Sequence, residues 1–245
     1  MQKNLTDYIF KNDVLNYESH LNGFTDSIFQ SFDSKSKELN LESKIDDLLS
    51  GKIINLSENQ AAWHPKYRSK FDSIPQTKKN KSKYKNVIIL GIGGSFEGPK
   101  LLIESLHDSS SDINHIFITG SDAYEFKDKV NNLNPDETIF IVSSKSFTTD
   151  ETLETLKEAI TWSGNIEKFI AITANKEEAA KYNIKEIIEF DKEIGGRYSI
   201  WSDINLPALY GPKSNFDPKL FLKGGYQADL DIQNNSDYLN FIKIL

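Results

Sequence analysis

The residues best suited to bind a charged ligand stand in two short loops, each directly after a run of apolar residues. The first loop, residues 91–95 (Gly-Ile-Gly-Gly-Ser), follows the apolar run 87–90. Its glycines let backbone N–H groups come close to a ligand, and the start of a helix just beyond favours an anion. The loop is not a dinucleotide fingerprint, because Phe96 replaces the last glycine, nor a P-loop, because Pro99 follows Gly98. A tight strand-to-helix turn without a ligand is the alternative.

The second loop carries four hydroxyl groups within six residues, at Ser144, Ser146, Thr148 and Thr149. Short hydroxyl side chains and backbone N–H groups can meet the acceptor oxygens of a phosphate monoester. Ordinary capping of a helix by a threonine is the alternative, and the two roles are compatible because both use the unpaired N–H groups of a first helical turn. Two such loops at the carboxyl ends of strands in one sheet favour a phosphorylated ligand lying across that edge.

Two cations accompany the loops. Lys145 could pair its ammonium with a phosphate, or it could expose its side chain while its backbone binds. Arg197 follows two glycines, and its permanent charge suits the stabilisation of a developing oxyanion, with a structural salt bridge as the alternative. None of the four histidines forms a pair with metal-site spacing, and the absence of cysteine excludes thiolate zinc sites and thiol nucleophiles. We therefore expect no metal and no cofactor.

These loops need a sheet to position them, and the pattern of the chain supplies one. From residue 86 onward, short apolar runs alternate with helical patterns, which predicts βαβ units and a parallel sheet with helices on both faces. The predicted strands lie near 87–91, 115–119, 138–143, 168–173 and 187–190. The predicted helices lie near 97–107, 122–132, 149–162 and 176–182, with a further helical stretch around 201–210.

Residues 1–80 are predicted to be mostly helical and polar. Leu5, Ile9 and Phe10 recur at helical spacing, as do the apolar residues of the stretch 41–49. Gly51 then marks the end of the second of these helices.

Composition sets the broad class of the protein. The chain has 245 residues, of which 38% are hydrophobic and 27% charged, as in a folded globular protein. A net charge of −7 argues against general nucleic-acid binding, which needs a basic surface. No stretch approaches the roughly 18 apolar residues of a membrane span, and the first residues lack the apolar run of a signal peptide. The prediction is a cytoplasmic protein with neither a nucleic-acid nor a membrane partner.

The motifs together resemble the glucose-6-phosphate isomerase family. Three blocks carry the resemblance in the family's order, GIGGS with a following GP, SKSFTTDET and GGRYSIWS, and a weaker likeness covers GKIIN and NQAAWH. These blocks occupy residues 91–99, 144–152, 195–202 and 51–64. The resemblance spans residues 45–230, and three separate loops in order make a chance match improbable.

The resemblance implies an α/β fold, a three-layer α/β/α sandwich with a five-stranded parallel sheet of the sugar-isomerase (SIS) type. That domain would cover residues 81–230, after a helical extension over 1–80. Residues 231–245 would begin a helix that leads to a second domain. Members of the family act without a metal, and the parent enzyme is expected to be a homodimer, because family sites are completed across subunits.

The resemblance also implies roles for individual residues. The phosphate would be held by Ser144, Ser146, Thr149 and the backbone of Lys145. Gly94 and Ser95 would line the sugar pocket, and Arg197 would stabilise the cis-enediolate formed after ring opening. Two departures stand out. Ser146 takes the place of a frequent threonine, and Asp203 that of a small uncharged residue, where it could pair with Arg197.

The implied reaction is the interconversion of glucose 6-phosphate and fructose 6-phosphate in glycolysis and gluconeogenesis. In the family, the glutamate that moves the proton and the histidine and lysine of ring opening lie beyond the arginine motif. No residue of this chain matches them, so we expect the chain to bind the sugar phosphate but to be inactive alone. A non-catalytic sugar-phosphate-binding module and one half of a split isomerase remain alternatives. Mannose in place of glucose also stays open.

Overall fold

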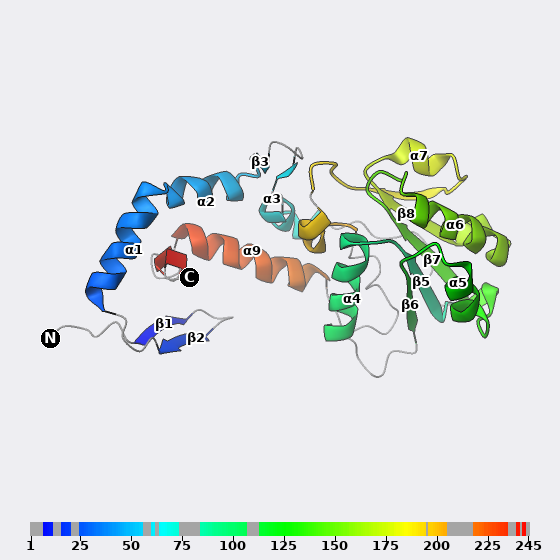
Figure 1. The fold of residues 1–245 in the computed structure, drawn as a ribbon, viewed down its shortest axis with the longest axis horizontal. Helices are drawn as coiled ribbons and strands as arrows, with labels where there is room; N and C mark the ends of the chain where they lie inside the picture. The colour runs from blue at the N-terminus through cyan, green and yellow to red at the C-terminus, as the bar shows by residue number, and fades with distance from the viewer. Residues whose placement is uncertain are drawn as a thin grey trace.

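The fold is built on a five-stranded sheet, seen in the computed structural model (Figure 1). The structure describes residues 7–11, 16–20, 25–55, 60–61, 64–73, 84–106, 113–194, 196–204, 218–234, 239–240 and 242–243. The sheet has the order β6-β5-β7-β8-β9, and every neighbouring pair in it is parallel. Its strands are β5 (Asn86–Leu90), β6 (Asn114–Ile118), β7 (Thr138–Ser143), β8 (Phe169–Thr173) and β9 (Glu186–Glu189).

The central strands are buried on both faces, as their continuous apolar runs require. Alternate residues of β5 enter different cores: Val87 and Ile89 pack on one face, and Ile88 and Leu90 on the other. Phe140 and Phe169 stack at 4.5 Å between ring centroids in the second core. The sheet is therefore the middle layer of a three-layer α/β/α sandwich, which confirms the predicted fold class.

Helices cover both faces of the sheet. The first core includes residues of α4 (Gly94–Leu106), and the second includes residues of α5 (Ala123–Val130), α6 (Asp150–Ser163) and α7 (Lys176–Ala180). All four were predicted within a few residues. Local signals explain their ends: the side chain of Asp122 caps the start of α5, and Gly164 ends α6 with a positive φ of 61°.

The N-terminal region contains helices and, unexpectedly, two short antiparallel strand pairs. Its elements are β1 (Asp7–Lys11), β2 (Asn16–His20), α1 (Asp26–Glu38), α2 (Leu41–Leu49), β3 (Ile53–Asn55), β4 (Gln60–Ala61), α3 (His64–Arg68) and the 3₁₀ helix η1 (Phe71–Ser73). The predicted helix with Ile9 and Phe10 is wrong, because both residues lie in β1, paired with β2. Aromatic and β-branched residues favour a strand, and this preference outweighed a helical spacing of only three residues. The helix over 41–49 is confirmed, with Gly51 at φ 73° beyond its end.

The last long helix, α9 (Pro218–Asn234), packs against α3 and extends away from the sheet (Figure 1). It crosses residue 230, the expected end of the SIS domain. The expected division into an extension, a SIS domain and a following helix stays a prediction. Residues 196–201 form the 3₁₀ helix η5 (Gly196–Trp201), while most of the helical stretch expected around 201–210 falls outside the described residues. None of the helices that the structure describes is both long and apolar enough to cross a membrane.

Candidate functional site

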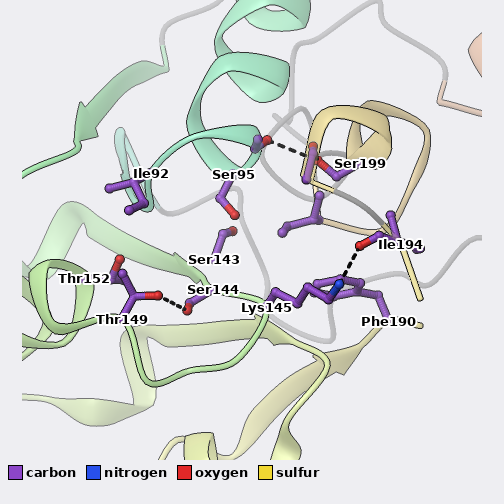
Figure 2. A pocket seen from close by; sticks show the side chains of 13 residues that line it. Ile92, Ser95, Ser143, Ser144, Lys145, Thr149, Thr152, Phe190, Ile194 and Ser199 are labelled. Carbon is purple, nitrogen blue, oxygen red and sulfur yellow. Dashed lines mark hydrogen bonds between the residues drawn. The ribbon is translucent and has the colours of Figure 1, made fainter. Parts of the chain in front are cut away.

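A pocket opens at the carboxyl-terminal edge of the sheet, between the two predicted loops and η5 (Figure 2). Its volume is about 180 Å³, below the ~300–1,000 Å³ of sites for drug-sized molecules, so it suits a small ligand. The lining residues are Ile92, Gly94, Ser95, Ser143, Ser144, Lys145, Thr149, Thr152, Phe190, Ile194, Gly196, Ser199 and Ile204. Five of the predicted ligand residues, Gly94, Ser95, Ser144, Lys145 and Thr149, are among them.

The first wall is the glycine loop and the start of α4, which lie against η5. A Cβ added at Gly94 would collide with the backbone carbonyl of Gly196, so only glycine allows this approach. A Cβ added at Gly196 itself would meet no atom within 4 Å. The Ser199 hydroxyl joins the two segments, since it lies within hydrogen-bond distance of the carbonyl oxygens of Gly196 (2.6 Å) and Gly94 (3.3 Å). Main chain thus packs on main chain along this wall.

The second wall is the hydroxyl loop, residues 144–149, which is held by its own short hydrogen bonds. The Ser144 Oγ accepts the Phe147 N–H at 3.2 Å and lies 3.3 Å from the Thr149 Oγ1. Phe147 has a left-handed φ of 53°, and its fully buried side chain fixes the turn. The Ser146 Oγ accepts hydrogen bonds from the backbone and hydroxyl of Thr148. Ser146 is exposed and is not among the lining residues of the pocket.

The N-terminus of α6 faces the same pocket. Thr149 is its N-cap residue, but its hydroxyl caps none of the free N–H groups of the first turn. Unpaired N–H groups and the helix dipole together favour an anion at such an end. Ser143 and Thr152 also line the pocket, but their hydroxyl oxygens are buried and have no hydrogen-bond partner within the described part of the chain.

The side chain of Lys145 runs along the pocket wall toward the segment after β9. Its ammonium donates to the carbonyl of Ile194 at 2.9 Å, and the side chain is half-buried. The expected exposed side chain is not found, because the side chain is half-buried and its nitrogen is bound to the backbone (Figure 2). Pairing of the ammonium with a phosphate stays a prediction.

Arg197 belongs to η5, but its side chain lies outside the described residues, and so does any pairing with Asp203. Asp203 itself is buried and accepts a hydrogen bond from the Tyr67 hydroxyl at 2.5 Å. Burial raises the pKa of the Asp203 carboxyl to about 6, although the Tyr67 hydrogen bond lowers it in part.

A buried ion pair between α3 and α9 lies against the end of η5. The guanidinium of Arg68 in α3 donates to both carboxylate oxygens of Asp229 in α9. The same guanidinium lies 4.5 Å from the centroid of the Trp201 ring at the end of η5. These contacts connect α3, α9 and η5 through an ion pair that is largely buried and the ring of Trp201.

Sequence reasoning missed Ser143, Thr152 and Ser199 as pocket residues. Ser143 ends an otherwise apolar strand, and a hydroxyl at that buried position is a signal that could have been used. Thr152 resembles any polar residue in a first helical turn. None of the described lining residues is Asp, Glu or His, and the described residues hold no cluster of three or more His, Asp or Glu that could bind a metal ion.

Comparison with known proteins gives one family over most of this region. The family model described as phosphoglucose isomerase matches residues 76–240. A glucose-6-phosphate isomerase of Legionella pneumophila is 32% identical over 244 residues, which cover 86% of this chain and 48% of that protein. A glucose-6-phosphate isomerase from Shewanella sp. (strain ANA-3) is 31% identical over 240 residues, with 81% of this chain and 44% of that protein covered. The chain thus spans about half the length of these relatives.

Solved structures agree with the fold. The crystal structure of a glucose-6-phosphate isomerase from Chlamydia trachomatis matches with a TM-score of 0.67 at 20% identity, over 89% of this chain and 48% of that one. The crystal structure of a hypothetical protein from Thermus thermophilus matches with a TM-score of 0.66 at 21% identity, over 88% of this chain and 53% of that one. At such identities the likeness establishes the architecture alone.

Proposed function

The chain belongs to the phosphoglucose isomerase family, and on that premise we propose that its pocket binds a hexose 6-phosphate, glucose 6-phosphate or fructose 6-phosphate. One observation carries the proposal. At the sheet edge, the uncapped N-terminus of α6 and the hydroxyl loop line one small pocket. A phosphate monoester supplies the negative charge and the acceptor oxygens that these groups lack.

The proposed contacts follow the two walls of the pocket. The hydroxyl loop would hold the phosphate through Ser144, Thr149 and the backbone of Lys145, and Gly94 and Ser95 would contact the sugar. Ser146 would act from the rim, since it is exposed and outside the lining. The Arg197 guanidinium would approach the sugar from η5 and stabilise negative charge on its oxygen.

Aldose–ketose isomerisation moves a proton between C1 and C2 of the opened sugar through a cis-enediolate, which requires a base. The described lining residues include no carboxylate and no imidazole. We therefore assign binding and oxyanion stabilisation to these residues, and proton transfer to groups beyond them. Because the chain covers 48% of its relative from Legionella, the complete reaction is proposed for an assembly larger than this chain.

Thermal unfolding with and without ligand tests the proposal. Glucose 6-phosphate and fructose 6-phosphate should raise the melting temperature, and inorganic phosphate should do so more weakly, while glucose should not. At one hundred times the dissociation constant, the stabilisation is about 2.7 kcal/mol. A coupled isomerase assay of the same preparation should give a rate lowered by about 10²–10⁴-fold or more relative to a complete enzyme, because the described lining residues supply no base. Equal shifts with glucose, or none with any sugar phosphate, would contradict the proposal.

A further inference from the structure

The pocket wall that contains η5 is a stretch of weak secondary structure. Residues 196–204 contribute Gly196, Ser199 and Ile204 to the lining of the pocket. The 3₁₀ helix η5 is six residues long. Runs of more than about four residues are uncommon in 3₁₀ helices, because their hydrogen bonds have poorer geometry than those of an α-helix. Contacts with other elements must therefore hold this wall in place.

Different elements hold the two ends of the stretch. At its start, the Ser199 hydroxyl lies 3.3 Å from the carbonyl oxygen of Gly94, where α4 begins. At its end, the carboxyl group of Asp203 accepts a hydrogen bond of 2.5 Å from the Tyr67 hydroxyl of α3, which packs against η5 (Figure 1). Asp203 directly precedes Ile204, which is 3% exposed and lines the pocket. The bond thus joins α3 to the neighbour of a pocket residue.

Both partners of this bond are held firmly. Tyr67 and Asp203 are each 8% exposed, and a polar group buried to that extent keeps the cost of leaving water if its partner is removed. The next residue of α3, Arg68, is paired with Asp229 of α9 and lies over the ring of Trp201. Separating Asp203 from Tyr67 is therefore costly, and moving Tyr67 would disturb the contact between α3 and α9.

We propose that Tyr67 and Asp203 are positioning residues of the pocket, whose hydrogen bond keeps the wall formed by residues 196–204 in the conformation that binds the ligand. The inference rests on the function proposed above and adds to it two residues that are not among those lining the pocket. Without the bond, a smaller fraction of molecules holds the wall in that conformation, and the apparent dissociation constant rises in inverse proportion to the fraction.

The test titrates full-chain variants with glucose 6-phosphate at one pH by calorimetry. Tyr67→Phe removes the hydroxyl that donates the bond and keeps the ring. It should weaken binding about threefold to tenfold, the factor that corresponds to the loss of one hydrogen bond. Asp203→Leu replaces the acceptor with an apolar side chain of similar shape and should weaken binding by a similar factor. Asp203→Asn keeps an oxygen that can accept from Tyr67, so its affinity should match that of the unsubstituted chain.

A double variant tests whether the two residues act through their shared bond. Once Asp203→Leu is present, adding Tyr67→Phe should cost little further affinity, because the bond is already lost. If the two losses add in full, the residues act separately and the inference is overturned. Asp203→Leu also decides the matter if Tyr67→Phe does not fold, since it removes the acceptor without leaving a buried charge.

Tyr84→Phe is the matched control. Tyr84 is 7% exposed, against 8% for Tyr67, and both residues belong to the same apolar core. Tyr84 precedes β5 and therefore lies at the amino-terminal edge of the sheet, whereas the pocket opens at the carboxyl-terminal edge. Its substitution should leave the affinity unchanged, whatever its effect on the melting temperature, which is measured for every variant.

The outcomes distinguish this inference from the proposed function. Unchanged affinity in folded Tyr67→Phe and Asp203→Leu would overturn the inference and leave the proposed function standing. A loss of affinity in Tyr84→Phe as large as in Tyr67→Phe would also overturn it, because the effect would then follow from general destabilisation. Failure of the unsubstituted chain to bind glucose 6-phosphate would instead refute the proposed function.

Discussion

The hydroxyl loop and the arginine segment, residues 196–203, face the same pocket but are positioned in different ways. Within the hydroxyl loop, Ser144 bonds to Phe147, three residues away, and to Thr149, five residues away. The arginine segment is held across long distances in the sequence: the residues of its bond to Gly94 are 105 positions apart, and those of its bond to Tyr67 are 136 apart. One wall is a local turn on a sheet, and the other is assembled from distant parts of the chain.

The two regions also differ in what stabilises them. The hydroxyl loop inserts Phe147 into an apolar core, which depends little on pH or charge. The arginine segment rests on buried polar groups, and a buried charge is favourable only while its partner is present. Changes in α3 or α9 should therefore reach η5 and leave the hydroxyl loop in place.

The largest loss of stability is expected when one partner of the Arg68–Asp229 pair, which supports the arginine segment, is removed. Both side chains are less than one-tenth exposed, at 8% and 9%. Asp229→Asn should lower the free energy of unfolding by about 3–5 kcal/mol, because it leaves the guanidinium buried without a counter-charge. Chemical denaturation measures the loss.

An exposed pair serves as the control for that change. Glu178→Gln removes the partner of Lys181, whose side chain is 65% exposed, and should cost less than about 1 kcal/mol. Replacing both buried partners, with Arg68→Met and Asp229→Leu, should recover most of the loss. An effect of Asp229→Asn no larger than that of the control would mean that the arginine segment does not depend on this pair.

The two regions should also differ in how their stability depends on pH, because the arginine segment contains Asp203. The pKa of Asp203 is about 6 in the folded chain against an ordinary value of 3.8. Between these values the folded state binds more protons than the unfolded state, so the free energy of unfolding falls as pH rises from 4 to 6. At about 1.4 kcal/mol for each pH unit, the fall attributable to Asp203 is about 3 kcal/mol.

Asp203→Asn should remove this fall, since an amide keeps a neutral acceptor for the Tyr67 hydroxyl. The variant should therefore be more stable than the unsubstituted chain at pH 7, and the advantage should shrink toward pH 4. Denaturation curves of both proteins across this range make the comparison, with every shared titrating group cancelling in the difference. Parallel pH profiles would show that Asp203 titrates normally.

The smallest expected effect belongs to the hydroxyl loop. Ser144→Ala removes the acceptor of the Phe147 N–H and should lower the free energy of unfolding by about 1 kcal/mol, equally at pH 4 and pH 7. Ser146→Ala, at an exposed position of the same loop, should change it by less than about 0.5 kcal/mol. A strong pH dependence of the Ser144→Ala effect would remove the distinction between the two regions.

The difference between local and long-range contacts also explains which parts of the fold could be predicted from the sequence. The five strands were predicted because their buried runs are continuous in sequence, and the two loops because they follow those runs directly. The supports of η5 carry no local pattern: Arg68 and Asp229 are 161 positions apart, and nothing near either residue indicates the other. The strand at Ile9 was missed because a few apolar residues fit both periodicities.

The residues that line the pocket differ in the same way. Gly94, Ser95, Ser144, Lys145 and Thr149 belong to recognisable motifs, and they reach the pocket together. Ser143 lies outside the motifs, and Thr152 ends the block 144–152 but resembles any polar residue of a first helical turn. Only their burial without a partner distinguishes them from ordinary strand and helix residues. The proposed roles of the motif residues, and that of Arg197, remain predictions.

The bare α-carbon of Gly196 has a practical consequence. Gly196 lines the pocket, yet a Cβ added there would meet no atom of the protein within 4 Å, whereas one added at Gly94 would collide with the main chain. Alanine at 196 should therefore be tolerated by the fold, at a position that borders the ligand pocket. Gly196→Ala would then report on how closely the ligand approaches this backbone, at little expected change in the stability of the protein.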